Sequence, residues 1–371
     1  MRVLFVTQYG RLAASSRTRV FQYLPYLAEN QIQTRVLTVL PDRAIAWSNA
    51  LVTRTPWRKV AYYAWASYRT LLCGLRAWWM ATGCDVLFVQ KVIFPAPVRW
   101  LLRRRRPPLA FDFDDAIFTT EVRQKSRMAA WKERRNARGL PAMLSLADLV
   151  IVENQYTAGY AQQFCRQVAT ITGPIDTHRF RPAEGGSRHA DRVVLGWIGS
   201  PSTLPYIALL ATALQRLSRR YPQVRLRVVG ADRFALDGVD VQATAWDLER
   251  EVEDLQGFDV GLTPIPDDPW TRGKGGYKLL QYMATGLPVV TSPVGINQEL
   301  VEDGKEGFWA SSAQEWEQRL AALVESPELR RRMGQRGRAK VGAEYALDAS
   351  SVRLVGLLRQ LATRTGTHEA P

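Results

Sequence analysis

Short apolar runs alternate with helix-compatible stretches along almost the whole chain, and this alternation restricts the possible folds more than any other feature of the sequence. In the first half, the runs predict buried strands at 2–7, 34–39, 85–90, 109–113, 148–153 and 168–172. Stretches that suit helices, among them 17–28 and 122–146, lie between these runs. Strands that alternate with helices form parallel sheets that are covered on both faces, because each crossover carries a helix back across the sheet. The first half therefore predicts an α/β domain.

A second series of the same kind follows a break between 173 and 192, where glycine, proline and polar residues are frequent. Its predicted strands lie near 193–198, 226–229, 241–243, 259–262 and 288–291, and its last helices at 328–341 and 346–361. We predict an α/β fold of two Rossmann-like domains, 1–180 and 181–345, whose parallel sheets face a central cleft. We expect 346–371 to be a helix that packs back on the first domain, followed by a frayed tail. Ligands bind at the carboxyl ends of the strands in such sheets, so functional residues are expected in the loops that follow each strand.

Cysteine content and hydropathy bear on where the protein works. Cys73, Cys84 and Cys165 show no zinc-like pairing, and no secretory leader precedes the first predicted strand. We therefore expect a reducing cytoplasm and no disulfide. The most apolar region, 60–95, is interrupted by arginines before it reaches the length of a membrane-spanning helix.

The net charge of +15 is carried by the first half of the chain. Residues 1–185 contain 27 Lys or Arg against 12 Asp or Glu, whereas residues 186–371 contain 23 against 23. The strong positive charge of residues 1–185 predicts an anionic partner, either nucleic acid or an acidic lipid surface. The segments 57–69, 76–80 and 100–106 mix Trp and Tyr with Arg, which is typical of helices at a membrane surface.

We expect this partner to be an anionic membrane surface, with the protein peripheral at its inner, cytoplasmic face. No nucleic acid is expected, because no nucleic-acid-binding module accompanies the charge. The alternative is an ordinary amphipathic helix with a solvated basic face.

A glycine-rich loop leads into a predicted helix within 271–290. Leu279, Leu280 and Met283 give this helix an apolar face, and Gly286 suits its C-terminal end. A helix that starts this way attracts a diphosphate through its backbone N–H groups, its positive dipole end and nearby cations. The residues assigned to this role are Arg272, Lys274, Gly275 and Gly276. The alternative is that the loop needs glycine only for close packing.

The segment 271–290, with 292–307 after it, resembles the donor-binding signature of the family 4 retaining glycosyltransferases. Likewise 173–182 resembles the interdomain segment of that family, Gly196-Trp-Ile-Gly-Ser-Pro-Ser-Thr203 its first loop in the second domain, and 258–264 the strand that leads to the donor site. The resemblance spans most of the second half and is thinner in the first. It implies the GT-B fold, no metal and no cofactor, and transfer of a sugar from a nucleoside diphosphate sugar with retention at the anomeric carbon.

The sequence departs from the family pattern at charged positions. Where the family carries two glutamates eight positions apart, this chain has Gly273 and Gln281, and Gln281 is left to bind the ribose without charge. The basic residues that the family places after the first strand of the second domain are also missing. The polar residues that this loop offers instead are Ser200, Ser202 and Thr203. Lys274 and Arg272 are then expected to make the main contacts with the diphosphate, with Lys278 as a weaker candidate.

An acidic cluster at 111–118 follows a predicted strand of the first half. By the resemblance, Asp114 lies near the position where many relatives carry a histidine beside the reacting sugar. We predict that Asp114 or Asp115 orients the acceptor hydroxyl or stabilises charge on the donor sugar, and we assign Lys274 to the catalytic residues with them. The alternative is that Asp112 and Asp115 cap neighbouring helices or pair with arginines, which is expected above all for Asp112. A rival reading takes Asp112 and Asp114 as the metal-binding pair of the other glycosyltransferase fold, which has a single domain; we predict no metal site.

Two further loops supply candidate residues. After the first strand, Gly10 and Arg17 or Arg19 are predicted to meet the donor diphosphate, although Ser16 in the same segment also suits the N-cap of the next helix. Trp246 lies where relatives recognise the base, and we predict that it stacks on the base.

Together these features predict a hexosyl- or related glycosyltransferase that moves a sugar from a nucleotide sugar to a lipid-linked or saccharide acceptor. The alternatives are a GT-B-fold binding protein without turnover, a nucleotide-sugar epimerase, and a nucleic-acid binder that uses the basic half.

Overall fold

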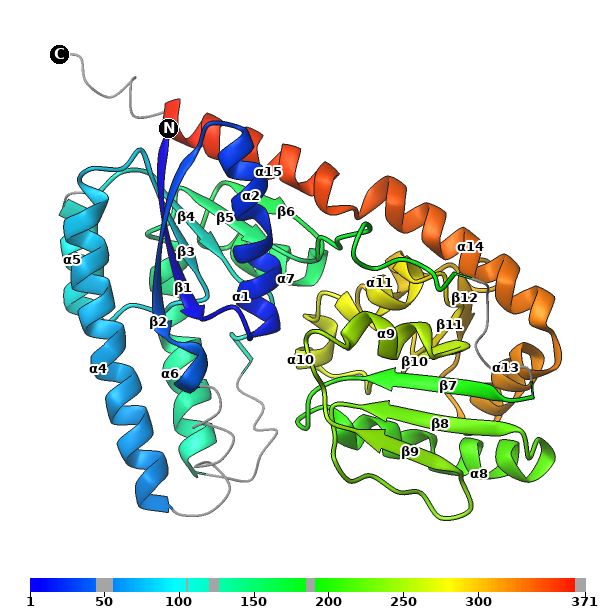
Figure 1. The fold of residues 1–371 in the computed structure, drawn as a ribbon. Coiled ribbons are helices and arrows are strands. Elements are labelled where there is room, and N and C mark those ends of the chain that lie inside the picture. The colour runs from blue at the N-terminus through cyan, green and yellow to red at the C-terminus, as the bar shows by residue number, and fades with distance from the viewer. Residues whose placement is uncertain (45–55, 105, 120–126, 185–190, 364–371) are drawn as a thin grey trace. The chain divides into compact units, whose positions relative to one another are not determined.

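The computed structural model describes residues 1–44, 56–104, 106–119, 127–184 and 191–363, which form two compact units (Figure 1). Unit 1 consists of Met1–Pro174, Gly273–Gly275 and Ser350–Pro371, and unit 2 consists of Ile175–Arg272 and Gly276–Ala349. The first unit therefore includes three residues of the glycine-rich loop. No helix among the described residues is both long and apolar enough to span a membrane.

Unit 1 contains a six-stranded parallel sheet with the strand order β2-β1-β3-β4-β5-β6. Its strands are β1 (Arg2–Tyr9), β2 (Gln33–Leu40), β3 (Val86–Gln90), β4 (Leu109–Asp112), β5 (Leu149–Val152) and β6 (Val168–Thr170). The central strands are apolar runs whose residues are all buried, as expected for a parallel sheet covered on both faces. All six strands of this unit were predicted from the sequence.

The helices of unit 1 cover both sides of this sheet, with α4 and α5 on one side and α1 and α2 on the other (Figure 1). They are α1 (Ala14–Arg19), η1 (Phe21–Tyr23), α2 (Leu24–Glu29), α4 (Pro56–Ala81), α5 (Ala96–Arg104), α6 (Arg127–Leu144) and α7 (Gln155–Ala161). The single helix predicted at 17–28 is wrong, because two short helices and a 3-10 turn replace it. The interruption lies at Val20, whose φ of −134° is outside the helical range, and Pro25 lies in the first turn of α2, where its missing N–H costs no helical hydrogen bond.

Unit 2 contains a second six-stranded parallel sheet with the order β12-β11-β10-β7-β8-β9. Its strands are β7 (Val193–Ile198), β8 (Val224–Val229), β9 (Val241–Thr244), β10 (Val260–Thr263), β11 (Val289–Thr291) and β12 (Gly307–Trp309). The sequence did not predict β12, a three-residue strand at the edge of the sheet. The two parallel sheets confirm the predicted fold class of two Rossmann-like domains.

The helices of unit 2 surround this sheet. They are η2 (Leu204–Leu210), α8 (Ala211–Arg220), α9 (Glu251–Gln256), α10 (Pro269–Arg272), α11 (Tyr277–Ala284), α12 (Asn297–Leu300), α13 (Ala313–Glu325) and α14 (Pro327–Glu344). The last helix, α15 (Leu347–Thr363), begins in unit 2, and its residues from Ser350 onward belong to unit 1. In unit 1, Arg359 of α15 donates a hydrogen bond to the carbonyl of Asn30 at 3.2 Å.

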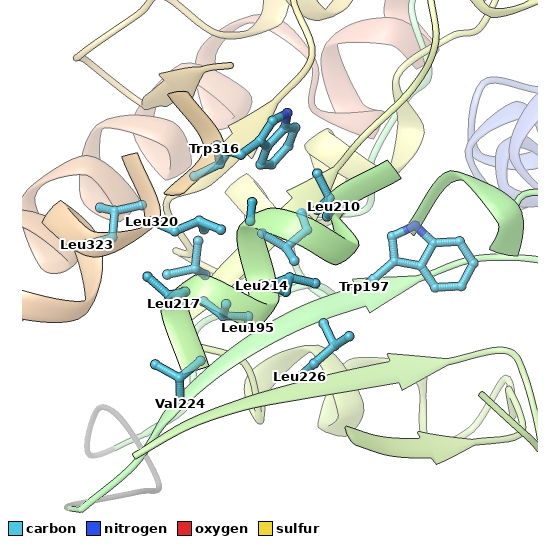
Figure 2. Close-up of a cluster of buried hydrophobic side chains, with 14 of the residues drawn as sticks. Leu195, Trp197, Leu210, Leu214, Leu217, Val224, Leu226, Trp316, Leu320 and Leu323 are labelled. Atoms are coloured by element: carbon cyan, nitrogen blue, oxygen red, sulfur yellow. The ribbon is translucent and has the colours of Figure 1, made fainter. Parts of the chain in front are cut away.

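The main core of unit 2 lies between β7, β8 and the helices packed on them, as Figure 2 shows. Leu195 and Trp197 of β7 meet Leu214 of α8 and Leu320 of α13, and all four side chains are buried. Burial of one such aliphatic side chain is worth about 1.5–3 kcal/mol relative to exposure. This core fixes the carboxyl end of β7, and with it the loop that begins at Gly199.

Candidate functional site

A buried arginine organises the carboxyl ends of β4 and β5 in unit 1. Arg19, at the end of α1, has a side chain only 2% exposed. Its Nε donates to both carboxylate oxygens of Asp112 at 3.1 Å, and its Nη1 donates to the Glu153 Oε1 at 3.3 Å and to the Ile171 carbonyl at 2.6 Å. A buried cation needs such partners to offset its desolvation. Asp112 therefore pairs with an arginine, as predicted, while Arg19 is engaged within the unit.

Lys91 holds the two carboxylates that the sequence assigned to catalysis. Its Nζ lies 2.6 Å from Asp114 Oδ1 and 2.6 Å from Asp115 Oδ2. Lys91 directly follows β3 and has a left-handed backbone with φ of 61°, which is uncommon for a residue other than glycine. Burial by itself would lower the pKa of Lys91, but Asp114 and Asp115 together raise it above its ordinary value. The acidic loop thus carries a permanently charged ammonium at its centre.

Two residues of the glycine-rich loop belong to this cluster in unit 1. The Lys274 Nζ lies 3.8 Å from Asp115 Oδ1, and the Lys274 carbonyl accepts a hydrogen bond from Asn154 Nδ2 at 2.9 Å. Gly275 is buried against Glu153, and a Cβ at this glycine would lie 1.6 Å from Glu153 Oε2. The structure thus brings Asp114, Asp115 and Lys274 together, and Gly275 is required for close packing.

Glu153 is a buried carboxyl beside this loop. Burial raises its pKa to about 8, an effect that Arg19 opposes and that Asp114 and Asp115 reinforce. Burial thus favours the protonated form of this carboxyl more than it would for a surface glutamate. A protonated carboxyl is a hydrogen-bond donor, and it does not repel a neighbouring anion.

The residues predicted after β1 have partners within unit 1. A Cβ at Gly10 would lie 2.3 Å from Asp42 Oδ1, so the glycine makes room for a carboxylate. Arg17 Nη1 donates to the Arg11 and Leu12 carbonyls at 3.4 and 3.1 Å. The roles of Gly10 and Arg17 toward a diphosphate remain predictions.

The alternative role of Ser16 as an N-cap is wrong. Helix α1 starts at Ala14 with Ala13 as its N-cap, so Ser16 lies inside the helix. Its hydroxyl donates to Gln90 Oε1 at 2.9 Å and accepts from the Tyr9 backbone at 3.2 Å. Ser16 thereby ties α1 to the ends of β1 and β3.

In unit 2, α11 brings a lysine to the loop after β7. Gly276 is the N-cap of α11, with a left-handed φ of 68°. Lys278 in the first turn places its Nζ 4.3 Å from the ring centroid of Trp197 and 3.4 Å from Thr203 Oγ1. The hydroxyls of Ser200 and Ser202, both exposed, lie 2.8 Å apart in the same loop. The lysine thus stands at a loop whose own residues from Gly199 to Thr203 carry no charge.

Arg272 lies at the C-terminal end of α10 and pairs with a neighbouring carboxylate. Its Nε and Nη2 donate to the two oxygens of Asp267 at 2.6 and 3.0 Å, and both side chains are about half exposed. The predicted contact of Arg272 with a diphosphate remains a prediction.

Glu251 joins the two residues predicted to bind the nucleoside. The Glu251 side chain, at the start of α9, is 4% exposed. Its Oε1 accepts from Gln281 Nε2 at 3.1 Å and from Trp246 Nε1 at 3.2 Å. Its Oε2 lies 2.9 Å from Arg179 Nη2. The structure therefore brings Trp246 and Gln281 to one buried carboxylate.

The sequence reasoning missed three residues of these clusters, Lys91, Glu153 and Glu251, and gave a fourth, Arg19, another role. Lys91 and Glu153 each directly follow a strand, so the rule that functional residues follow parallel strands would have found them. Arg19 was considered only as a ligand of the donor, and Glu251 lies in a helix with no local signal of its role. No three His, Cys, Asp or Glu side chains are grouped to hold a metal ion within the parts of the chain that the structure describes.

Comparisons with known proteins bear on the family. Residues 192–326 match the family described as "Glycosyl transferases group 1". D-inositol 3-phosphate glycosyltransferase of Segniliparus rotundus is 24% identical over 58% of this chain and 53% of that protein. The chain thus spans about half the length of the first curated relatives that it matches.

Solved structures match over nearly the whole chain. Sucrose-phosphate synthase from Thermosynechococcus elongatus superposes with a TM-score of 0.70 and 17% identity, covering 97% of this chain and 99% of that one. Anabaena HepE, solved in complex with UDP and glucose, superposes with a TM-score of 0.64 and 16% identity, covering 97% and 100%. The chain thus has the two-domain GT-B fold, and its residues 192–326 match the group 1 glycosyl transferases.

Proposed function

We propose that the protein transfers a sugar from a nucleoside diphosphate sugar to an acceptor hydroxyl, with retention at the anomeric carbon. The observation that carries this proposal is the approach of Lys278, from the first turn of α11, to the loop after β7. The first turn of an α-helix has backbone N–H groups without intrahelical partners and a positive dipole end, which suit a diphosphate. The family match over 192–326 and the complex of HepE with UDP support the same class of donor.

The reaction exchanges one bond at the anomeric carbon of the donor sugar. The acceptor oxygen forms a bond to this carbon, while the bond from the carbon to the phosphate oxygen breaks. The acceptor proton passes to a phosphate oxygen of the departing nucleoside diphosphate, which acts as the base. We assign Asp114 and Asp115, held by Lys91, to orienting the acceptor hydroxyl or stabilising charge on the sugar.

We further propose that the acceptor is lipid-linked or a saccharide at the inner face of a membrane. The supporting feature is the α4–α5 surface of unit 1, defined by the exposed residues Trp57, Arg58, Tyr68, Arg76, Trp79, Trp100, Arg103 and Arg104. No acidic residue occurs in α4 or α5, and Arg104 stacks on Trp100 at 4.0 Å. Aromatic rings suit the interfacial region of a bilayer, and each arginine adds about 1 kcal/mol near an anionic surface.

The donor proposal is tested with Lys278→Ala. Loss of a charged hydrogen-bond donor to a diphosphate costs about 1.5–3 kcal/mol, so we expect the Kd for the nucleoside diphosphate to rise roughly ten- to a hundredfold. UDP, GDP and TDP are titrated by calorimetry, and release of nucleoside diphosphate from their sugars is measured with membranes present. Lys305→Ala is the matched control, because Lys305 is half exposed and pairs only on the surface with Glu302. An unchanged Kd in Lys278→Ala would contradict the proposal.

A second candidate is a GT-B-fold binding protein that does not turn over the donor. Gly273 and Gln281 favour it, because they stand where the resemblance implies two glutamates. Nucleotide binding that is lost in Lys278→Ala, without release of nucleoside diphosphate from any common donor, would support this candidate over the enzyme.

The membrane proposal is tested by vesicle sedimentation. The variant Trp57→Ala/Trp79→Ala is expected to lose most of its binding to phosphatidylglycerol vesicles, because both rings are more than half exposed on α4. Leu209→Ala/Val352→Ala is the control, since these apolar side chains are also more than half exposed but lie outside α4 and α5. Equal retention of both variants on anionic vesicles, or retention of the wild type on duplex DNA instead, would contradict this part of the proposal.

A further inference from the structure

A carboxylate lies behind the residues assigned to the nucleoside, although the sequence has none at the expected position. By the resemblance, residue 281 would be a glutamate that binds ribose, but it is Gln281. Glu251 from the neighbouring helix α9 instead brings a buried carboxylate to within 3.1 Å of the Gln281 amide nitrogen. The charge missing from α11 is thus present on α9.

Glu251 also determines which way the Gln281 amide faces. A carboxylate only accepts hydrogen bonds, so the NH₂ end of the amide must point toward Glu251 and the carbonyl end must point away. No donor to Gln281 Oε1 is found among the residues that the structure describes, and Gln281 is 4% exposed. A hydroxyl of a bound ligand is the kind of donor that this oxygen can take.

Three other contacts keep Glu251 in this position. Trp246 Nε1 donates to the same carboxylate oxygen at 3.2 Å, and the Arg179 guanidinium pairs with the other at 2.9 Å. Arg179 also donates to the Leu248 carbonyl at 2.7 Å, which ties it to the segment between Trp246 and Glu251. The indole that is assigned to the base and the amide that is assigned to the ribose are therefore oriented by one side chain.

We infer that Glu251 is a positioning residue for nucleoside recognition: it presents the Gln281 carbonyl oxygen to a ribose hydroxyl and fixes the Trp246 indole beside it. This inference rests on the proposed function, because it assigns the nucleoside end of the same donor. It predicts that nucleoside recognition needs one amide and one carboxylate at positions 251 and 281, whichever residue carries each.

The test is a charge swap between the two positions in the full-length protein. UDP and GDP are titrated by calorimetry, and the tighter of the two is compared with its 2′-deoxy and 3′-deoxy analogues. A site built to bond a hydroxyl rejects the analogue that lacks it, so we expect the wild type to prefer the ribonucleotide over one analogue by about tenfold or more. Glu251→Gln should reduce this preference, while Glu253→Gln, an exposed glutamate two residues along α9, should not.

Gln281→Glu is expected to weaken ribonucleotide binding about tenfold at pH 8, because it sets two carboxylates side by side. Its affinity should recover as the pH falls to 5.5, since one protonated carboxyl can then donate to the other as the amide does. The double variant Glu251→Gln/Gln281→Glu should bind the ribonucleotide more tightly than Gln281→Glu at pH 8, because one amide and one carboxylate again face each other.

Two results would overturn the inference while leaving the proposed function intact. One is a double variant that binds no better than Gln281→Glu, and the other is a ribose preference that Glu251→Gln leaves unchanged. Failure of the proposed function has a different signature, because then none of UDP, GDP and TDP binds the wild type, or Lys278→Ala binds them as the wild type does. Thermal unfolding of each variant separates loss of recognition from loss of folding.

Discussion

Gly275 and Glu153 lie against each other in unit 1, and the absence of a side chain at Gly275 is what permits the contact. We expect Gly275→Ala to reduce stability by about 1–3 kcal/mol, because the added methyl group must displace a buried carboxyl or the loop itself. The displaced loop carries Lys274, so donor turnover should fall as well. Urea unfolding measures the first effect and release of nucleoside diphosphate the second.

Gly342→Ala is the matched control for this substitution. Gly342 lies in α14 with no atom close to the position of an added Cβ, so alanine should stabilise the helix by about 0.5–1 kcal/mol. Equal stability of the two variants would show that the contact between Gly275 and Glu153 is unimportant.

Glu153 also gives the stability of the protein a dependence on pH. Its pKa rises from an ordinary 4.5 to about 8 on folding, so between these values the folded state binds more protons than the unfolded state. The free energy of unfolding must therefore fall as the pH rises from 4.5 to 8, by at most about 1.4 kcal/mol per unit. Above pH 8 this contribution stays constant.

Glu153→Gln removes this titration and is expected to gain stability relative to the wild type as the pH rises through that window. Urea unfolding of both proteins at pH 5, 6, 7 and 8 measures the difference. A constant difference across the series would show that Glu153 is ionised throughout, with Arg19 dominating its pKa.

At the scale of single elements, helix ends are specified by local side chains, and α13 is a clear case. Ser312 Oγ accepts from the Glu315 backbone at 3.2 Å, and the Glu315 carboxylate accepts from the Ser312 backbone at 3.1 Å, which is a capping box. Ser312→Ala is expected to reduce stability by about 1 kcal/mol, measured by urea unfolding. Ser311→Ala is the control, since its hydroxyl is not the cap; an equal loss in both variants would refute the role of the cap.

Strands were predictable from the sequence because a buried parallel strand must be a continuous apolar run, as Val86–Gln90 and Leu149–Val152 are. The edge strand Gly307–Trp309 was not, because a run of three residues is too short to show a period. The break at Val20 was missed because this position carries neither glycine nor proline, so nothing local marks it in the apolar pattern of 17–28.

Some residues of the candidate site could likewise be predicted from the sequence and others could not. Lys274, Lys278 and Asp114 were predictable because they are adjacent in sequence to strand ends or to a helix start. The buried residues Arg19 and Glu251 were not predictable, since their partners are distant in the sequence. Glu153 lies 134 positions from Arg19, and Gln281 lies 30 positions from Glu251. Such pairings are products of the tertiary fold, and no local spacing encodes them.

At the scale of the whole molecule, the excess positive charge and the exposed aromatic side chains of α4 and α5 both belong to unit 1, whereas residues 186–371 are neutral. Net charge governs encounter rates and nonspecific binding rather than the fold. The sequence alone could therefore predict the same architecture for both halves, while their different partners stay a prediction.

The final helix starts in unit 2 and ends in unit 1, and this path sets an order of events during synthesis. A ribosome releases the chain from its first residue onward, so unit 1 stays without its last segment until the codons beyond Ser350 have been translated. Unit 2, which ends at Ala349, has all its residues earlier. The part of the protein that is made first is therefore the last to be completed.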